Sequence, residues 1–309
     1  MNPGAWPAAR TYLYVPGDRD GVLAAAAGRG ADALIVDLED AVPLADKARA
    51  RQVLTAWLAA GPDHARDQKS AGIPSTAAPQ IWVRVNPVSA GRGAMTAADL
   101  RAAAAAPVAG FLVPKAEDAG EIRYVSGLLG PLEAALGLPD GHFKLVPLIE
   151  SARGLRAVAA LAAAPRVVRL QLGEADLAAD LGLIPADDEL ELLPARSTVV
   201  QACAAAGLAA PAGSACVEIG DLRRLEETTQ RLRRLGFAGR SVIHPAQIPV
   251  VHRVFTPTPE EVGRARRVVA AFERAQQAGS AVAVDEDGRM VDQAVVRAAR
   301  RVLALPAGP

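Results

Sequence analysis

The chain has 309 residues, with 34 basic and 34 acidic side chains and a formal net charge of zero. This balance argues against general attraction to nucleic acid or an anionic membrane and favours a small-molecule partner. The two cysteines, Cys203 and Cys216, fit no metal-ligand spacing and are too few for a disulfide-stapled secreted protein. Residues 1–9 lack a signal-peptide pattern and no apolar stretch is long enough to span a bilayer, so we expect a soluble cytoplasmic protein.

Short apolar runs alternate along the chain with Ala-, Leu- and Arg-rich segments of helical period. The runs are residues 12–16, 33–38, 81–85, 110–114, 144–149, 167–172, 215–219 and 241–243. This alternation predicts repeated βαβ units, and eight of them favour a closed (β/α)8 TIM barrel. A doubly wound sheet is the alternative, but residues 15–19 hold one glycine where a dinucleotide-binding turn needs three.

Two segments depart from this alternation. The insert at residues 61–79 is rich in Gly, Pro, Ser and charge, and a helix-to-strand loop of this kind lies on the face opposite the catalytic rim. Beyond the eighth run, residues 258–261 provide an N-cap, a proline and a capping-box glutamate for a helix, and residues 292–305 predict a second one. We therefore expect a barrel over residues 1–255 and a C-terminal helical extension over 256–309 that packs across the barrel or on a neighbouring subunit.

Polar side chains follow most of the predicted strands. They are Glu39, Asp40, Arg84, Asn86, Lys115, Glu150, Glu174, Asp176 and His244. In a parallel barrel the carboxyl ends of all strands meet at one rim, so residues far apart in sequence can share one pocket there. The sequence therefore places the chemistry at this rim.

Glu150 and Asp176 follow consecutive predicted strands. Two carboxylates in this arrangement can hold one hard divalent cation such as Mg²⁺ and leave positions open for water and substrate oxygens. The alternative makes each acid a helix cap, because both precede apolar helical segments. Their position on adjacent strand ends favours the metal site.

The segment from Asp37 to Asp40 is densely acidic and needs positive charge nearby. A cation on the rim could provide it, and so could the basic residues of the next helix, Lys47, Arg49 and Arg51. We expect each explanation to hold for different members of the cluster.

Three further residues carry alternative interpretations. Arg84 lies in an apolar strand, so it needs a buried anionic partner, and its planar fork can bind a carboxylate or a developing oxyanion. Lys115 could form a Schiff base in a metal-free aldolase, which we rank below the metal hypothesis because such a site has no need for several carboxylates. His244 could orient a ligand, but without metal-ligand spacing a structural hydrogen bond is favoured.

Taken together, these motifs are those of a known family. They read YVPGDR (14–19), DLEDAV (37–42), RVNP (84–87), VPK (113–115), LIESA (148–152), GEADLAADLG (173–182), IHPAQI (243–248) and DGRMVD (287–292). In this order and over nearly the whole chain, the sequence resembles the citrate lyase β-subunit-like branch of the HpcH/HpaI aldolases, which includes malyl-CoA, citramalyl-CoA and citrate-type lyases.

The resemblance implies a TIM barrel that assembles into trimers or hexamers. It also assigns roles: Glu150 and Asp176 hold Mg²⁺, and Glu39 and Asp40 contact its waters. Substrate binding falls to these two metal ligands together with the three basic residues Arg84, Lys115 and Arg19. Arg84 would bind the carbonyl or thioester oxygen, and Arg19 a coenzyme A phosphate.

The same resemblance makes Asp292 an acid/base that reaches a neighbouring subunit's pocket. Two departures bear on substrate. Residues 22–25 lack the basic side chains that contact coenzyme A in relatives, and residues 212–218 replace an aspartate-rich pattern.

The function we expect is Mg²⁺-dependent cleavage of a carbon–carbon bond in a 3-hydroxyacyl-CoA thioester, which yields an acyl-CoA and a 2-oxo acid, or the reverse reaction that forms this bond. A metal aldolase acting on free 2-oxo acids without coenzyme A is one alternative. A catalytically silent paralogue that binds a metabolite or protein is the other.

Overall fold

The structure is a computed structural model that describes residues 9–61, 78–89, 91, 93–280, 282–286 and 288–305. The predicted insert at 61–79 lies almost wholly outside these residues. The chain divides into two compact units between His252 and Arg253. Among the described residues, no helix is both long and apolar enough to cross a membrane.

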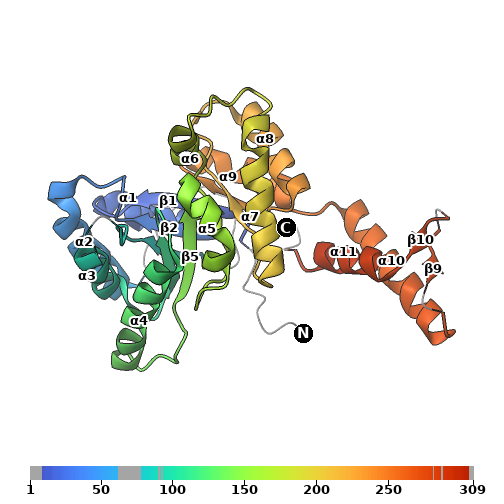
Figure 1. Cartoon of the computed structure of the whole chain (residues 1–309), viewed down its shortest axis with the longest axis horizontal. Coiled ribbons are helices and arrows are strands. Elements are labelled where there is room, and N and C mark those ends of the chain that lie inside the picture. Colours follow the sequence, from blue (N-terminus) through green and yellow to red (C-terminus); the bar gives the residue numbers. More distant parts are fainter. Residues whose placement is uncertain are drawn as a thin grey trace. The chain divides into compact units, whose positions relative to one another are not determined.

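The first unit is a closed barrel of parallel strands, in which β8 pairs with β1. Figure 1 labels strands β1, β2 and β5 of this barrel among the helices of the unit. Its strands are β1 (Thr11–Pro16), β2 (Ala33–Asp37), β3 (Gln80–Arg84), β4 (Val108–Val113), β5 (Lys144–Ile149), β6 (Gln171–Leu172), β7 (Ala212–Gly213) and β8 (Gly239–Val242). The predicted TIM barrel is confirmed.

Helices follow the strands, as the βαβ pattern requires. They are α1 (Asp20–Ala26), α2 (Lys47–Ala60), α3 (Gly93–Ala103), α4 (Ala119–Ala135), α5 (Ala152–Ala162), α6 (Glu174–Leu181), α7 (Leu193–Ala205), α8 (Leu222–Leu235) and α9 (Ile248–Phe255). Short 3₁₀ turns are η1 (Ala27–Arg29), η2 (Leu44–Asp46), η4 (Leu190–Leu192) and η5 (Pro245–Gln247).

The seventh strand is where the sequence prediction was wrong. It lies at Ala212–Gly213, not at 215–219, and pairs with Gln171 and Gly239. Gly213 lets α8 approach closely, because a Cβ there would lie 2.5 Å from Leu232. The apolar run that looked like a strand is a loop with Val217 exposed. Hydrophobicity at this position therefore marks the barrel rim rather than its core.

The sixth and eighth strands also differ from the prediction. β6 is reduced to two residues, and the start of the predicted run makes one isolated bridge, from Val167 to Leu145. β8 begins at Gly239 and ends at Val242.

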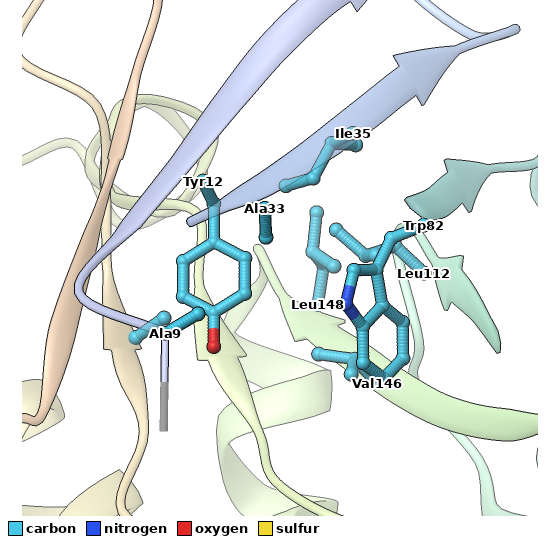
Figure 2. Packing of buried hydrophobic residues seen from close by; sticks show 9 residues of the cluster. Ala9, Tyr12, Ala33, Ile35, Trp82, Leu112, Val146 and Leu148 are labelled. Atoms are coloured by element: carbon cyan, nitrogen blue, oxygen red, sulfur yellow. The ribbon is translucent and has the colours of Figure 1, made fainter. Parts of the chain in front are cut away.

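Alternate residues of the strands fill the barrel. Tyr12, Ile35, Trp82 and Leu148 belong to one buried cluster that joins several strands (Figure 2). Because side chains of a strand point alternately to opposite faces, the residue two positions later faces the interior as well. The same inward face therefore continues from the core to the carboxyl ends of the strands.

The second unit contains α10 (Pro259–Gln277), a hairpin of β9 (Ala283–Val284) and β10 (Met290–Val291), and α11 (Gln293–Leu303). Thr258 caps α10 in the predicted capping box with Glu261. The unit has its own apolar cluster, which includes Phe272, Val291 and Val296.

Candidate active site at the carboxyl ends of the strands

Three charged side chains continue the inward face of the barrel. Asp37 follows Ile35, Arg84 follows Trp82 and Glu150 follows Leu148, each two residues after a core position. Strand alternation therefore turns all three toward the interior at the carboxyl-terminal rim.

A pocket of about 480 Å³ lies at this rim. Its polar lining includes Asp37, Arg84, Glu150, Glu174 and Asp176, and part of its apolar lining comes from Leu148, Val217 and Ile243. Residues from the ends of seven strands, all except β4, thus meet in one cavity at the rim.

Glu150 is 5 % exposed, and its Oε2 accepts a hydrogen bond of 2.7 Å from the backbone N–H of Lys115. Burial, followed by the negative charges of Glu39 and Asp176, raises the pKa of Glu150 to about 7 against the opposing effects of the Lys115 N–H and Arg84. Among the described residues, this carboxylate forms no ion pair.

Two backbone features accommodate Glu150. Lys115 has a φ of +50°, a left-handed conformation that is uncommon outside glycine and directs its N–H to the carboxylate. Gly173 provides room, because a Cβ there would lie 2.5 Å from Glu150 Cγ and 2.6 Å from Oε1.

Asp176 lies in the first turn of α6 and is exposed toward the same pocket. In the described part of the chain its carboxylate accepts no hydrogen bond and forms no ion pair. The backbone N–H groups of Ala175 and Asp176 likewise have no acceptor there. The N-terminus of α6 thus presents a free carboxylate and two free amide donors to the pocket.

Arg84 is held rigidly by acids. Its Nε and Nη2 donate to the two Asp37 oxygens at 2.8 and 2.6 Å, and Nη1 lies 2.8 Å from Glu39 Oε2. Its guanidinium also covers the Tyr14 ring. Burial alone would lower the pKa of Arg84, but the hydrogen bonds and charge of Asp37 outweigh it, so the group stays charged.

Lys115 completes the acidic cluster. Its Nζ lies 2.5 Å from Glu39 Oε1 and 3.4 Å from Asp40 Oδ1. Although partial burial lowers the pKa of Lys115, the hydrogen bond and charge of Glu39 raise it more. A Schiff-base lysine must be neutral to attack a carbonyl, so this environment disfavours that alternative.

Among the described residues, the acidic cluster forms no ion pair with the basic side chains of the next helix. Lys47 donates to the carbonyl oxygens of Leu38 and Glu39, Arg49 donates to the Asp18 carbonyl, and Arg51 binds Asp99. The ion pairs come instead from Arg84 and Lys115 at other strand ends. Lys47 contributes at longer range, because the charges of Asp37, Glu39 and Asp40 oppose the lowering of its pKa by burial.

Three other candidates of the first unit are not part of the pocket lining, and a fourth, Asp292, belongs to the second unit. Asn86 binds the Leu38 carbonyl and Asp99 and is buried, so its role is structural. His244 is exposed and caps a short 3₁₀ turn through Nδ1. Arg19 is exposed just before α1. Asp292, in the second unit, caps α11 through Oδ1.

Sequence reasoning missed the buried Arg196. Both oxygens of Glu174 bind it, at 2.7 and 2.8 Å. A signal was present, because Arg196 falls four residues after Leu192 and three before Val199, on the buried stripe of α7. A charged residue on such a stripe predicts a buried partner.

The donor set fits a divalent ion that is coordinated partly by the protein and partly by water or substrate. Across the described ranges, no three His, Cys, Asp or Glu side chains are grouped tightly enough to hold a metal by themselves. Glu150 and Asp176 instead both line the open pocket as hard oxygen ligands, and Mg²⁺ characteristically keeps water or substrate oxygens in its remaining positions.

Known proteins resemble this chain closely. Citrate lyase subunit beta of Leuconostoc mesenteroides subsp. cremoris is 33 % identical over 297 residues, covering 96 % of this chain and 92 % of the relative. A (3S)-malyl-CoA thioesterase of Cereibacter sphaeroides is 34 % identical over 295 residues, covering 96 % and 93 %.

The solved structures agree. CitE of Mycobacterium tuberculosis, in complex with magnesium, acetoacetate and coenzyme A, matches with a TM-score of 0.72 at 30 % identity and covers 96 % of this chain and 97 % of that one. The family model described as HpcH/HpaI aldolase/citrate lyase matches residues 10–245. The chain therefore belongs to the HpcH/HpaI aldolase/citrate lyase family and is an enzyme of the carbon–carbon lyase class.

Proposed function

We propose that this enzyme uses Mg²⁺ to cleave, or in reverse to form, a 3-hydroxyacyl-CoA thioester, with an acyl-CoA and a 2-oxo acid as the products of cleavage. The observation that carries the proposal is the pair Glu150 and Asp176, which face one pocket beside the fixed cation Arg84. The Mycobacterium tuberculosis neighbour solved with magnesium, acetoacetate and coenzyme A supports it.

Glu150 and Asp176 hold the metal. Glu150 is buried without an ion pair, and Asp176 accepts no hydrogen bond in the described protein, so both gain from a divalent cation. When bound, Mg²⁺ polarises the carbonyl of the oxo acid and binds its carboxylate.

The start of α6 orients the oxo acid. The unpaired N–H groups of Ala175 and Asp176 sit at the positive end of the helix, which favours an anion. These donors bind the carboxylate of the 2-oxo acid.

Arg84 stabilises the thioester enolate that forms when the carbon–carbon bond breaks. A guanidinium has five N–H donors, and Asp37 and Glu39 fix it while leaving the second N–H of Nη2 for a substrate oxygen. Because these partners hold it before substrate arrives, little reorganisation is needed in the transition state.

In cleavage the 3-hydroxyl group loses one proton as the carbonyl forms, and Asp292 supplies one proton to the α-carbon of the acyl group. In condensation Asp292 removes the α-carbon proton and the new alkoxide gains one. Both capping hydrogen bonds go to Oδ1, so Oδ2 has no partner among the described residues. The residue acts in the pocket of a neighbouring copy within a trimer or hexamer, which makes oligomerisation a requirement of the reaction.

A second candidate reaction is thioester hydrolysis. The malyl-CoA thioesterase relative is as similar to this chain as the citrate lyase subunit, so family membership alone does not select between them. The products differ: a lyase releases an acyl-CoA and a 2-oxo acid, whereas a thioesterase releases free coenzyme A and the hydroxy acid.

The test incubates the protein with malyl-CoA, citramalyl-CoA and citryl-CoA, and separately with free 2-oxo acids such as pyruvate. Each incubation contains Mg²⁺ or EDTA, and all four product types are measured together with loss of the free oxo acid. We expect acyl-CoA and 2-oxo acid, lost in EDTA and in Glu150→Ala and Asp176→Ala. Asp140→Ala, which removes an exposed acid before β5 and outside the pocket lining, should keep full activity.

Full turnover in EDTA would refute the metal role. Release of free coenzyme A with the intact hydroxy acid would favour the thioesterase. Activity on free oxo acids alone would identify a CoA-independent aldolase, and no turnover with any substrate would favour a silent paralogue.

A further inference from the structure

The helix that carries Asp176 is weakly anchored by apolar contacts. α6 has eight residues and buries only Leu177 among them. It ends at Gly182, and the chain then runs through residues 183–189 before η4. Mg²⁺ demands near-ideal ligand geometry, so the start of this short helix needs another anchor.

Arg196 provides this anchor from the first turn of α7. Its side chain is 2 % exposed, and its Nε and Nη2 bind both oxygens of Glu174 at 2.7 and 2.8 Å. Nη2 also lies 2.8 Å from Glu189 Oε2. One guanidinium thus joins the first residue of α6 to the last residue of the loop that follows it.

The geometry of both ends shows how closely this segment is held. Glu189 adopts a φ of +56°, uncommon for a residue other than glycine. At the other end the N–H of Glu174 donates to Ser214 Oγ at 2.9 Å, and this hydroxyl in turn donates to the Leu172 carbonyl. The start of α6 is therefore tied to α7, β6 and the end of β7.

We propose that Arg196 is a positioning residue that fixes Asp176 for Mg²⁺ binding by clamping residues 174–189 at both ends. The inference rests on the proposed metal role of Asp176. Arg196 itself contacts neither the metal nor the substrate, and it acts through the backbone between Glu174 and Asp176.

This role predicts a change in Mg²⁺ affinity opposite in direction to the change that charge alone would cause. Removing the positive charge of Arg196 leaves Glu174 and Glu189 uncompensated, which by charge alone would attract Mg²⁺ more strongly. If Arg196 positions Asp176, the same change weakens Mg²⁺ binding. The sign therefore separates the two explanations.

The experiment measures Mg²⁺ affinity by isothermal titration for Arg196→Met and Arg196→Lys. Lysine keeps the charge but lacks the fork that binds two acids. Arg166 is a matched control, because it also joins two acids, Glu133 at 2.6 Å and Asp140 at 2.8 Å, and lies before β6 at the opposite end of the barrel strands. Arg166→Met and Arg166→Lys are the control variants.

We expect both Arg196 variants to bind Mg²⁺ about 10- to 100-fold more weakly, the range seen when partners that orient metal ligands are lost. The Km for the oxo acid should rise with the metal dissociation constant. The Arg166 variants should match the wild type in both. Unchanged or tighter Mg²⁺ binding by the Arg196 variants would overturn the proposal.

If circular dichroism shows that the Arg196 variants do not fold, Ser214→Ala tests the proposal in their place. It is neutral and removes the acceptor of the Glu174 N–H. Weaker Mg²⁺ binding, by about tenfold, supports the clamp, and wild-type affinity overturns it. A wild-type protein that binds no Mg²⁺ would overturn both the clamp and the metal site, which distinguishes that failure from a failure of the clamp alone.

Discussion

Gly173→Ala should displace Glu150 without straining the backbone. Gly173 has a φ of −100°, which alanine adopts freely, so the change acts through its methyl group. That methyl would lie 2.5 Å from Glu150 Cγ, whereas ordinary contact begins at 3.4 Å. Glu150 must therefore retreat by about 1 Å, and its hydrogen bond to the Lys115 N–H limits the directions it can take.

A misplacement of this size in a catalytic site costs about 100-fold in rate, or about 2.7 kcal/mol of transition-state stabilisation. We expect kcat/Km to fall by about that factor and Mg²⁺ affinity to fall with it. Overpacking should also lower the free energy of unfolding by about 1–3 kcal/mol. Steady-state kinetics, isothermal titration with Mg²⁺ and urea unfolding measure the three quantities.

Gly127→Ala is the matched control. Gly127 lies at an exposed position of α4, and a Cβ there meets nothing within 4 Å. Alanine should raise stability by about 0.5–1 kcal/mol and leave kcat/Km unchanged. If Gly173→Ala kept wild-type Mg²⁺ affinity and turnover, the space beside Glu150 would have no part in metal binding, and this reasoning would be refuted.

Three further predictions follow from charges. Asp292→Asn should abolish turnover yet preserve Mg²⁺ and 2-oxo acid binding, because asparagine still caps α11; retained turnover would show that the proton is moved elsewhere. Pyruvate should bind the Mg²⁺-loaded enzyme more tightly than oxaloacetate. The described pocket lining holds five acids and one base, Arg84, so it repels the second carboxylate of oxaloacetate. Equal dissociation constants of the two acids in titration would contradict this. Burial alone would raise the pKa of Asp32, but hydrogen bonds from Arg10 and His252 hold this pKa well below its usual range. Ionised Asp32 therefore stabilises the fold above about pH 4, and this stabilisation is lost as the pH falls further. Asp32→Asn should therefore cost more stability at pH 7 than at about pH 3 in urea unfolding, and an equal cost at both would count against the ion pair.

The barrel and the meeting of charged residues at its rim were predictable because two simple periodicities encode them. Alternating strand and helix patterns give the barrel, and the two-residue period of each strand carries the inward face from Trp82 to Arg84 and from Leu148 to Glu150. These features depend on local sequence and on a closure rule common to all such barrels.

The failures arose where tertiary contacts decide. The run at 215–219 has the composition of a strand, yet the close approach of Leu232 to Gly213 sets the strand earlier. The counter-charges of Glu39 come from Arg84 and Lys115, which are remote in sequence, and nearby basic residues were the wrong choice. Pairings across strand ends depend on side-chain direction, which composition does not contain.

Two structural elements with different properties divide the proposed reaction between them. The wall formed by Asp37, Glu39, Arg84 and Lys115 is preassembled by short ion pairs, so it can stabilise an enolate without moving. The start of α6, residues 173–176, instead offers an unpaired carboxylate, unpaired amides and the space that Glu150 occupies. Changes at residues 173–176, or at Arg196 that clamps them, should therefore lower Mg²⁺ and oxo-acid affinity. Changes in the proposed proton donor Asp292 should abolish turnover and leave both affinities intact, so binding and chemistry are separable by measurement in this protein.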